Sequence, residues 1–209
     1  MKIIRILTWC VLGVILFASA GHAAQTTANH SEVLKYLQDL QTTPENRTIR
    51  GLPRFGTISG AIDGMGVNIT LDRTLWTITG TLNQAPINVK IDHSRMTIFG
   101  TANKYPIDLD FTWTPEKVTY KGLAAASTYE STLIWSPGSL TGFAGGAPLN
   151  LNFDIEAGVV HGTACKGFVS LSFDKVSGRL LGNFAGRAVN IVLVNLDLFD
   201  FLQHLYLFL

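Results

Sequence analysis

The sequence predicts an all-β protein: an antiparallel meander of about 14 short strands that curls into a barrel or a trough. Two observations lead to this prediction. Glycine recurs at intervals of 20 residues, with one interval of 22, and apolar residues occupy alternate positions on either side of each glycine. These features divide the chain into seven repeats, anchored at Gly60, Gly80, Gly100, Gly122, Gly142, Gly162 and Gly182.

Each repeat is expected to supply two strands that share one buried face. In the first repeat, Ile58 stands two positions before the glycine, and Val67 and Ile69 stand seven and nine positions after it. Alternation with a period of two is typical of strands with one apolar side. The fourth repeat fits the pattern least well, because Tyr129 and Ser131 take the positions of the two apolar residues.

The segments between the strands have the composition of turns. Within a repeat, a four-residue break such as NQAP, NKYP or GGAP joins the two strands. Its even length keeps both apolar faces on the same side. Between repeats, SPGS (136–139), EAGV (156–159) and VSGR (176–179) place glycine where a tight hairpin needs a positive φ. The earlier linkers RTLW and HSRM lack this glycine, so the turn signal covers about half of the chain.

A parallel β-solenoid with one repeat per coil is the alternative architecture. In a solenoid, equivalent residues stack at a spacing of about 4.8 Å, which would place Asp72 on Asp92 and Asp154 on Asp174. Such stacking of like charges is unfavourable. In a meander, an intervening strand separates these aspartates, so the meander is the favoured prediction.

Residues 1–23 have the features of a secretory signal peptide that is removed from the mature protein. Two basic residues precede an apolar run from residue 6 to residue 17, and small residues follow, so cleavage is expected after Ala20 or Ala23. The apolar run is shorter than the roughly 20 residues that a transmembrane helix needs. The protein is therefore predicted to be exported, either to the periplasm or as a secreted protein.

The composition of the predicted mature chain argues against a nucleic-acid partner and against a disulfide. Removal of the signal peptide lowers Lys plus Arg from 16 to 14 against 15 Asp plus Glu, a net charge near −1. This balance gives no electrostatic basis for binding nucleic acid. Cys165 is the only cysteine that remains, so no disulfide is expected within the chain.

Two amphipathic helices are predicted outside the β domain of residues 57–196. The first, at residues 31–40, lies in an N-terminal segment (24–56) and has Ser31 as its N-cap. The second, at residues 197–209, carries Asp197, Asp200 and His204 on one narrow stripe and is otherwise apolar. It is expected either to fill the core of the fold or to contact a membrane surface.

The sequence gives no catalytic constellation, metal site or cofactor motif. The histidines of the mature chain are isolated, and none has the spacing of a metal ligand. His161, Ser172 and Asp174 would lie near one another on the polar face, but nothing supplies the nucleophile turn or oxyanion donors of acyl transfer. We therefore expect a protein that is not an enzyme and that carries neither a cofactor nor a metal ion.

The leading functional hypothesis is an exported protein that binds a lipid or another apolar molecule within the curled sheet, closed by the terminal helices. The second strands and the C-terminal helix supply the predicted ligand-binding residues, which are Ile69, Val89, Leu109, Leu151, Leu171, Ile191, Phe201 and Leu205. One alternative is a small outer-membrane β-barrel whose apolar face points outward. Another is a structural or adhesive β-repeat protein whose apolar face is only core.

The signal peptide yields the first testable prediction. When the full-length chain is expressed in bacteria, the protein recovered outside the cytoplasm should lack its first 20 or 23 residues, because signal peptidase cuts after a small residue. Intact-mass measurement should then fit a chain that starts at Gly21 or Ala24. An exported protein that retains Met1 would contradict the prediction.

Overall fold

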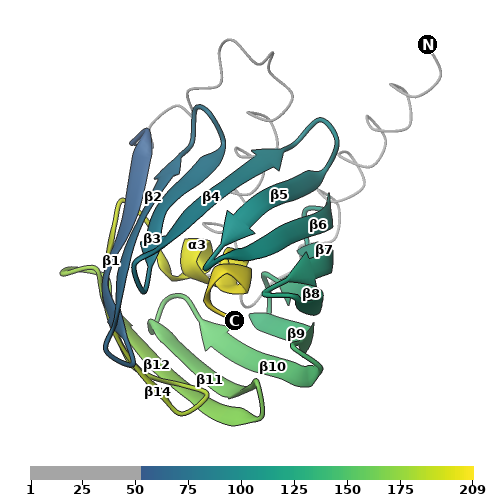
Figure 1. The fold of residues 1–209 in the computed structure, drawn as a ribbon. Helices are drawn as coiled ribbons and strands as arrows, with labels where there is room; N and C mark the ends of the chain where they lie inside the picture. The colour runs from purple at the N-terminus through teal and green to yellow at the C-terminus, as the bar shows by residue number, and fades with distance from the viewer. Residues whose placement is uncertain (1–52) are drawn as a thin grey trace.

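The computed structural model describes residues 53–209, which form a closed barrel of 14 antiparallel strands with one short helix at the C-terminal end (Figure 1). The predicted all-β meander is thus confirmed, and the parallel solenoid is wrong because each strand pairs antiparallel with the strands before and after it in sequence. The strands are β1 (Phe55–Ile62), β2 (Met65–Asp72), β3 (Thr77–Leu82), β4 (Ala85–Asp92), β5 (Thr97–Ala102), β6 (Tyr105–Trp113), β7 (Lys117–Ala124), β8 (Ser127–Ile134), β9 (Ser139–Ala144), β10 (Ala147–Asp154), β11 (Val159–Ala164), β12 (Gly167–Asp174), β13 (Arg179–Phe184) and β14 (Arg187–Val194).

The barrel closes where β1 pairs with β14. This seam is antiparallel and runs from Thr57 opposite Val194 to Ile62 opposite Val189. Closure leaves no strand edge exposed, which removes the unpaired backbone groups through which open sheets associate. Because the chain is a meander, all turns within repeats lie at one end of the barrel, and all loops between repeats lie at the other.

The apolar face of the sheet points into the barrel. Val89, Leu109, Leu151, Leu180 and Ile191 are each 0 % exposed, and they belong to one core cluster that includes residues from every strand. The alternate residues face outward and are largely threonine, serine, asparagine, aspartate and lysine. The sequence pattern left the direction of the apolar face open, and closure into a barrel turns it inward.

The turns within repeats are shorter than predicted. Two residues, not four, connect the strands, and both have positive φ, as at Asn83 (49°) and Gln84 (64°). This is the conformation of a type I′ turn, whose twist matches that of the flanking strands. In the NQAP break (residues 83–86), Ala85 and Pro86 already belong to β4. Proline is tolerated there because it stands near the start of the strand. The even loop length is preserved, so the predicted register is unchanged.

Five of the six loops between repeats contain four residues and end on a residue with positive φ, whereas the loop between β6 and β7 has three residues (114–116) and none with positive φ. Gly138, Gly158 and Gly178 take this position in three loops, with φ of 89°, 69° and 69°. Trp76 and Met96 adopt the same conformation without being glycine, with φ of 54° and 57°. The loop geometry is therefore common to both halves of the chain, although the glycine signal is present in only one half.

The repeating glycines stand in the first strand of each repeat, where two strands approach closely. Gly80 has a φ of 140°, and a Cβ atom placed on it would lie 2.0 Å from the carbonyl oxygen of Asn68 on β2. The other six repeat glycines have φ between 135° and 152° and equally close backbone neighbours. Such positions are essentially restricted to glycine.

The C-terminal segment lies inside the ring of strands (Figure 1). It consists of the helix α3 (Leu198–Gln203) and the 3-10 helix η2 (Leu205–Phe208). The predicted continuous helix over residues 197–209 is thus interrupted at His204. The predicted signal peptide and the predicted helix at 31–40 lie outside the described residues.

The close approach at Gly80 is testable by substitution. Gly80→Ala should destabilise the protein by about 1–3 kcal/mol or more, because it adds a backbone clash to a disfavoured φ. Gly66→Ala is the matched control, since its Cβ would meet nothing within 4 Å, and it should change stability by about 0.5 kcal/mol or less. Urea unfolding of both variants gives the comparison. Equal stability of the two variants would contradict this account of the repeat glycines.

Candidate functional site

The structure places all eight predicted ligand-binding residues in the lumen. Six of them lie on β2, β4, β6, β10, β12 and β14, and two lie on the C-terminal segment. They are buried, with exposed fractions of 3 % or less, and belong to the same core cluster. The wall residues are distributed around the circumference instead of gathering in one pocket. The lumen as a whole is therefore the candidate site, and its use by a ligand remains a prediction.

The C-terminal segment crosses this lumen and contacts opposite parts of the wall. The Tyr206 ring lies 6.2 Å from the Tyr120 ring on β7 and 6.3 Å from the Tyr129 ring on β8, measured between centroids. On the other side, Leu207 and His204 border a small space together with residues of β1, β2 and β3. The segment thus connects two sides of the barrel that are far apart along the chain.

Polar contacts hold the C-terminal segment near both ends of the barrel. Near the turns within repeats, Nη2 of Arg187 donates to the carbonyl oxygen of Phe208 at 2.9 Å. Near the loops between repeats, Arg73 and Asp200 form an ion pair with an N–O distance of 3.4 Å. The C-terminal segment follows β14 and runs back through the lumen, from the end with the loops between repeats toward the end with the turns within repeats.

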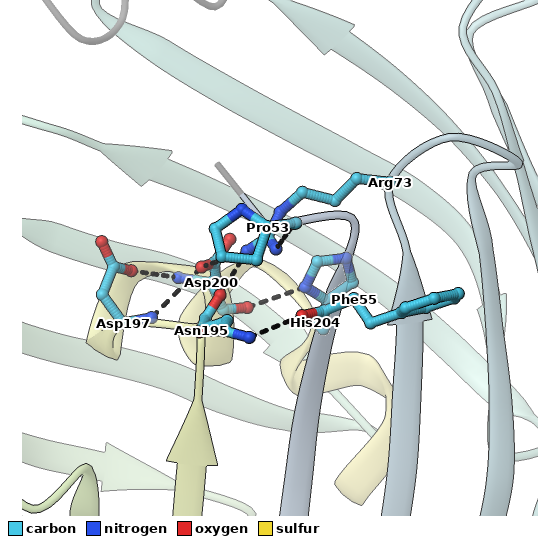
Figure 2. A network of polar contacts seen from close by, with 7 residues as sticks. All are labelled: Pro53, Phe55, Arg73, Asn195, Asp197, Asp200 and His204. Carbon is cyan, nitrogen blue, oxygen red and sulfur yellow. Dashed lines mark hydrogen bonds and ion pairs between the residues drawn. The ribbon is translucent and has the colours of Figure 1, made fainter. Parts of the chain in front are cut away.

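Arg73 is the centre of the polar network at the seam (Figure 2). It is only 6 % exposed, and it lies in the loop between β2 and β3. Its guanidinium donates to the carbonyl oxygen of Pro53 at 2.9 Å and to that of Asn195 at 2.7 Å, besides pairing with Asp200. One side chain therefore joins the residues just before β1, the residues just after β14 and the helix inside the barrel.

The same network caps α3. Asp197 accepts a hydrogen bond from the backbone N–H of Asp200 at 2.8 Å, and Asp200 accepts one from the N–H of Asp197 at 3.1 Å. This reciprocal arrangement is a capping box. At the end of the helix, Nδ1 of His204 donates to the carbonyl oxygen of Asp200 at 2.7 Å (Figure 2). The three residues of the predicted polar stripe, Asp197, Asp200 and His204, thus form hydrogen bonds within the segment itself.

The surroundings of the network shift the pKa values of its members. Burial raises the pKa of the Asp200 carboxyl, although the charge of Arg73 acts in the opposite direction. Desolvation and the neighbouring Asp200 raise the pKa of Asp197 to about 6. Burial lowers the pKa of His204 to about 4, and Arg73 adds to this effect. His204 is therefore neutral at pH 7.

A small space next to the network has no capacity for a lipid. It is lined by Ile58, Ile69, Leu71, Ile78, Leu196, Asp200, His204 and Leu207. About 10 Å³ is available in it, which is room for one water molecule. The network contains no nucleophile placed against a base, so its arrangement is that of a clamp between the seam and the C-terminal segment.

A second polar group lies in the lumen, away from the seam. The hydroxyls of Tyr129, Ser131 and Tyr206 are buried, and among the described residues they have no hydrogen-bond partner outside this group. Tyr129 and Ser131 lie on β8 and face inward, with each residue 1 % exposed. Sequence reasoning recorded the departure of the fourth repeat from the apolar pattern but did not treat it as a site. That departure was the available signal.

Residues 53–209 show no metal site and no catalytic group on the outer face. No group of three or more histidine, cysteine, aspartate or glutamate residues in this range could hold a metal ion. His161 pairs with Ser170 across β11 and β12 and is exposed on the outer face, while Asp174 accepts hydrogen bonds in the loop that follows β12. Among the described residues, no helix is long and apolar enough to cross a membrane.

Comparisons with family models, with curated proteins and with solved structures give no match for this chain. The fold and the lumen therefore define the class by themselves: a closed 14-strand antiparallel barrel with an apolar interior that contains its own C-terminal segment.

The role of Arg73 as a clamp predicts a large effect on stability. Arg73→Met should lower the free energy of unfolding by about 2–4 kcal/mol, because it leaves Asp200 and two backbone carbonyls without their donor. Lys175→Met removes the exposed ion pair with Glu156 and should cost less than about 1 kcal/mol. Denaturant unfolding measures both. If the two variants lose the same stability, Arg73 does not clamp the seam.

The pKa of His204 predicts how stability depends on pH. The unfolded chain, with a histidine pKa near 6.5, binds more protons than the folded protein between about pH 6.5 and pH 4. This histidine therefore contributes stability above pH 6.5 that is lost as the pH falls to about 4. The raised pKa values of Asp197 and Asp200 act in the opposite direction, so the total pH dependence is smaller than that of His204 alone.

The difference between wild type and His204→Asn isolates this contribution, because asparagine keeps an N–H donor near the position of Nδ1 but does not titrate. Relative to the variant, wild type should lose roughly 1–3 kcal/mol between pH 7 and pH 4. A difference that stays constant with pH, measured by urea unfolding, would contradict the buried neutral state of His204.

Proposed function

We propose that this protein is an exported, non-enzymatic carrier that holds a lipid or another apolar molecule inside its barrel. The observation that carries the proposal is the continuous apolar lining of the lumen. Inward-facing apolar residues come from all 14 strands, and they form one cluster with the C-terminal segment. An apolar interior of this kind favours apolar ligands, because transfer of their surface out of water lowers the free energy.

The dimensions of the barrel support the proposal. A round barrel of 14 strands is about 28 Å across between opposite backbones, for strands about 4.8 Å apart and tilted by about 40°. A single helix is about 10–12 Å across with its side chains. The C-terminal segment alone is therefore too narrow to fill a round lumen. In a round lumen, a bound apolar molecule would occupy the remaining space.

The outer face of the barrel favours a protein that is surrounded by water over the outer-membrane alternative. Outward positions on β10 carry Asn150, Asn152 and Asp154, and those on β12 carry Ser170, Ser172 and Asp174. A membrane-spanning barrel instead presents an apolar band to lipid. The exposed apolar residues are scattered over this face, and Phe99, for example, lies between Lys90 and Asp108 on the adjoining strands.

The structural or adhesive alternative explains the same fold without a ligand. In that case the chain fills its own interior, with the C-terminal segment and the predicted helix at 31–40 as the candidates. The two functions differ in one measurable property, which is the presence of a molecule other than the chain in the purified protein.

Native mass spectrometry of the exported protein, purified without detergent, tests the proposal. We expect a monomer or oligomer with excess mass that leaves on denaturation. Leu151→Trp, which adds volume to the lumen, should reduce the excess mass. Asn150→Trp, the adjacent outward position, should not. A folded wild-type protein of bare mass that also binds no added fatty acid or ester would overturn the proposal and favour the structural alternative.

A further inference from the structure

The hydroxyl groups of Tyr129, Ser131 and Tyr206 form a polar group, here called the hydroxyl cluster, in an otherwise apolar lumen. Ser131 lies two residues after Tyr129 on the same face of β8, and the rings of Tyr129 and Tyr206 lie 6.3 Å apart. All three residues are 1 % exposed. Tyr129 and Ser131 interact with each other, and within the described part of the chain none of the three hydroxyls has a hydrogen-bond partner outside this group.

Unpartnered hydroxyls of this kind are costly in a folded protein. Leaving one buried donor unsatisfied costs about 1–3 kcal/mol, and most buried polar atoms in proteins have a partner. An apolar residue at these positions would avoid the cost, and the other repeats carry one: Ile69, Val89, Leu109, Leu151, Leu171 and Ile191 occupy the position equivalent to Ser131. The hydroxyl cluster therefore indicates a partner outside the protein.

Small residues flank part of the hydroxyl cluster on the barrel wall. The cross-strand neighbours of Tyr129 are Gly122 and Ala144, and one neighbour of Ser131 is Gly142. None of these residues has a side chain larger than a methyl group. The other neighbour of Ser131 is Tyr120, so small residues and one tyrosine ring, and no bulky aliphatic side chain, flank the hydroxyls of β8.

The charges near the hydroxyl cluster select the class of ligand group. Burial raises the pKa of Tyr129 to about 12 and also raises that of Tyr206, so both phenols remain protonated and can donate. Among the inward-facing strand residues of the described barrel, the only charged one is Arg187, at the first position of β14. A buried carboxylate without a cation is strongly disfavoured. Neutral donors without a counter-ion suit a neutral acceptor.

We propose that the hydroxyl cluster binds the neutral carbonyl group of an apolar ligand, such as an ester or a protonated carboxyl group, while the aliphatic lumen holds the hydrocarbon chain. This inference rests on the proposed carrier function and specifies its ligand. Tyr129 and Ser131 donate from the wall, and Tyr206 donates from the C-terminal segment. The ligand is thereby oriented, with its polar group toward β8 and its chain toward the rest of the lumen.

Competition binding with three probes of matched chain length tests this assignment. Methyl dodecanoate, dodecanoic acid and dodecane each displace a fluorescent apolar reporter from the delipidated full chain at pH 8. For wild type we expect the ester to bind at least tenfold more tightly than the hydrocarbon, as hydrogen bonds to two or three donors imply. We also expect the ester to bind more tightly than the acid, which is ionised at this pH.

The double variant Tyr129→Phe/Ser131→Ala should lose most of the preference for the ester while its affinity for dodecane stays the same. The unchanged dodecane affinity shows that the variant folds and keeps its lumen. Tyr105→Phe/Thr132→Ala removes two hydroxyls that face away from the site or lie at the rim, and it should behave as wild type.

The possible results separate this inference from the carrier proposal. If wild type binds none of the three probes, the carrier proposal itself fails. If wild type binds them without preferring the ester, or if the double variant keeps the preference, the role of the hydroxyl cluster is wrong and the carrier proposal stands. If the ionised acid binds more tightly than the ester, the polar group of the ligand binds near Arg187 instead, and the inference is also overturned.

Discussion

The pairing of β1 with β14 is the interaction on which the rest of the structure depends. Once the sheet closes, its two faces become an inside and an outside, and the apolar side chains of every strand must share one enclosed space. The seam is also where the C-terminal segment leaves β14 and enters the lumen. Arg73 bonds both sides of the seam and the helix that enters there. Closure and occupation of the lumen are therefore linked through one buried side chain.

The two polar groups inside the barrel differ in how their hydrogen bonds are satisfied. At the seam, Arg73, Asp197, Asp200 and His204 pair with one another and with backbone atoms. Their polar atoms serve to anchor α3, because each buried charge or donor has a protein partner. The hydroxyl cluster on β8 and η2 has no partner outside the cluster among the described residues. The network at the seam explains how the C-terminal segment is anchored, and the hydroxyl cluster indicates what kind of ligand the lumen would bind.

Departures from a repeat carry information that the repeat itself does not. Seven similar units build a wall in which equivalent positions have equivalent surroundings, so an apolar residue is the default at each inward position. Ser131 departs from this default, and Tyr129, two residues before it, packs against Tyr206. The repeat glycines show the opposite behaviour. They are retained in all seven units because a Cβ atom would meet the carbonyl oxygen of the neighbouring strand in each of them.

The sequence by itself determined the strands and their number and favoured an antiparallel order over a solenoid, since these follow from local periodicity and from turns between adjacent segments. It also determined that Ile69 and its equivalents share one face with Phe201 and Leu205 as apolar partners. Only the tertiary structure decided the direction of that face, the pairing of β1 with β14, the break at His204 and the meeting of Tyr129 with Tyr206. These features join residues separated by tens to more than a hundred positions. No local pattern encodes such contacts, because they arise only when the closed barrel brings distant strands and the C-terminal segment together.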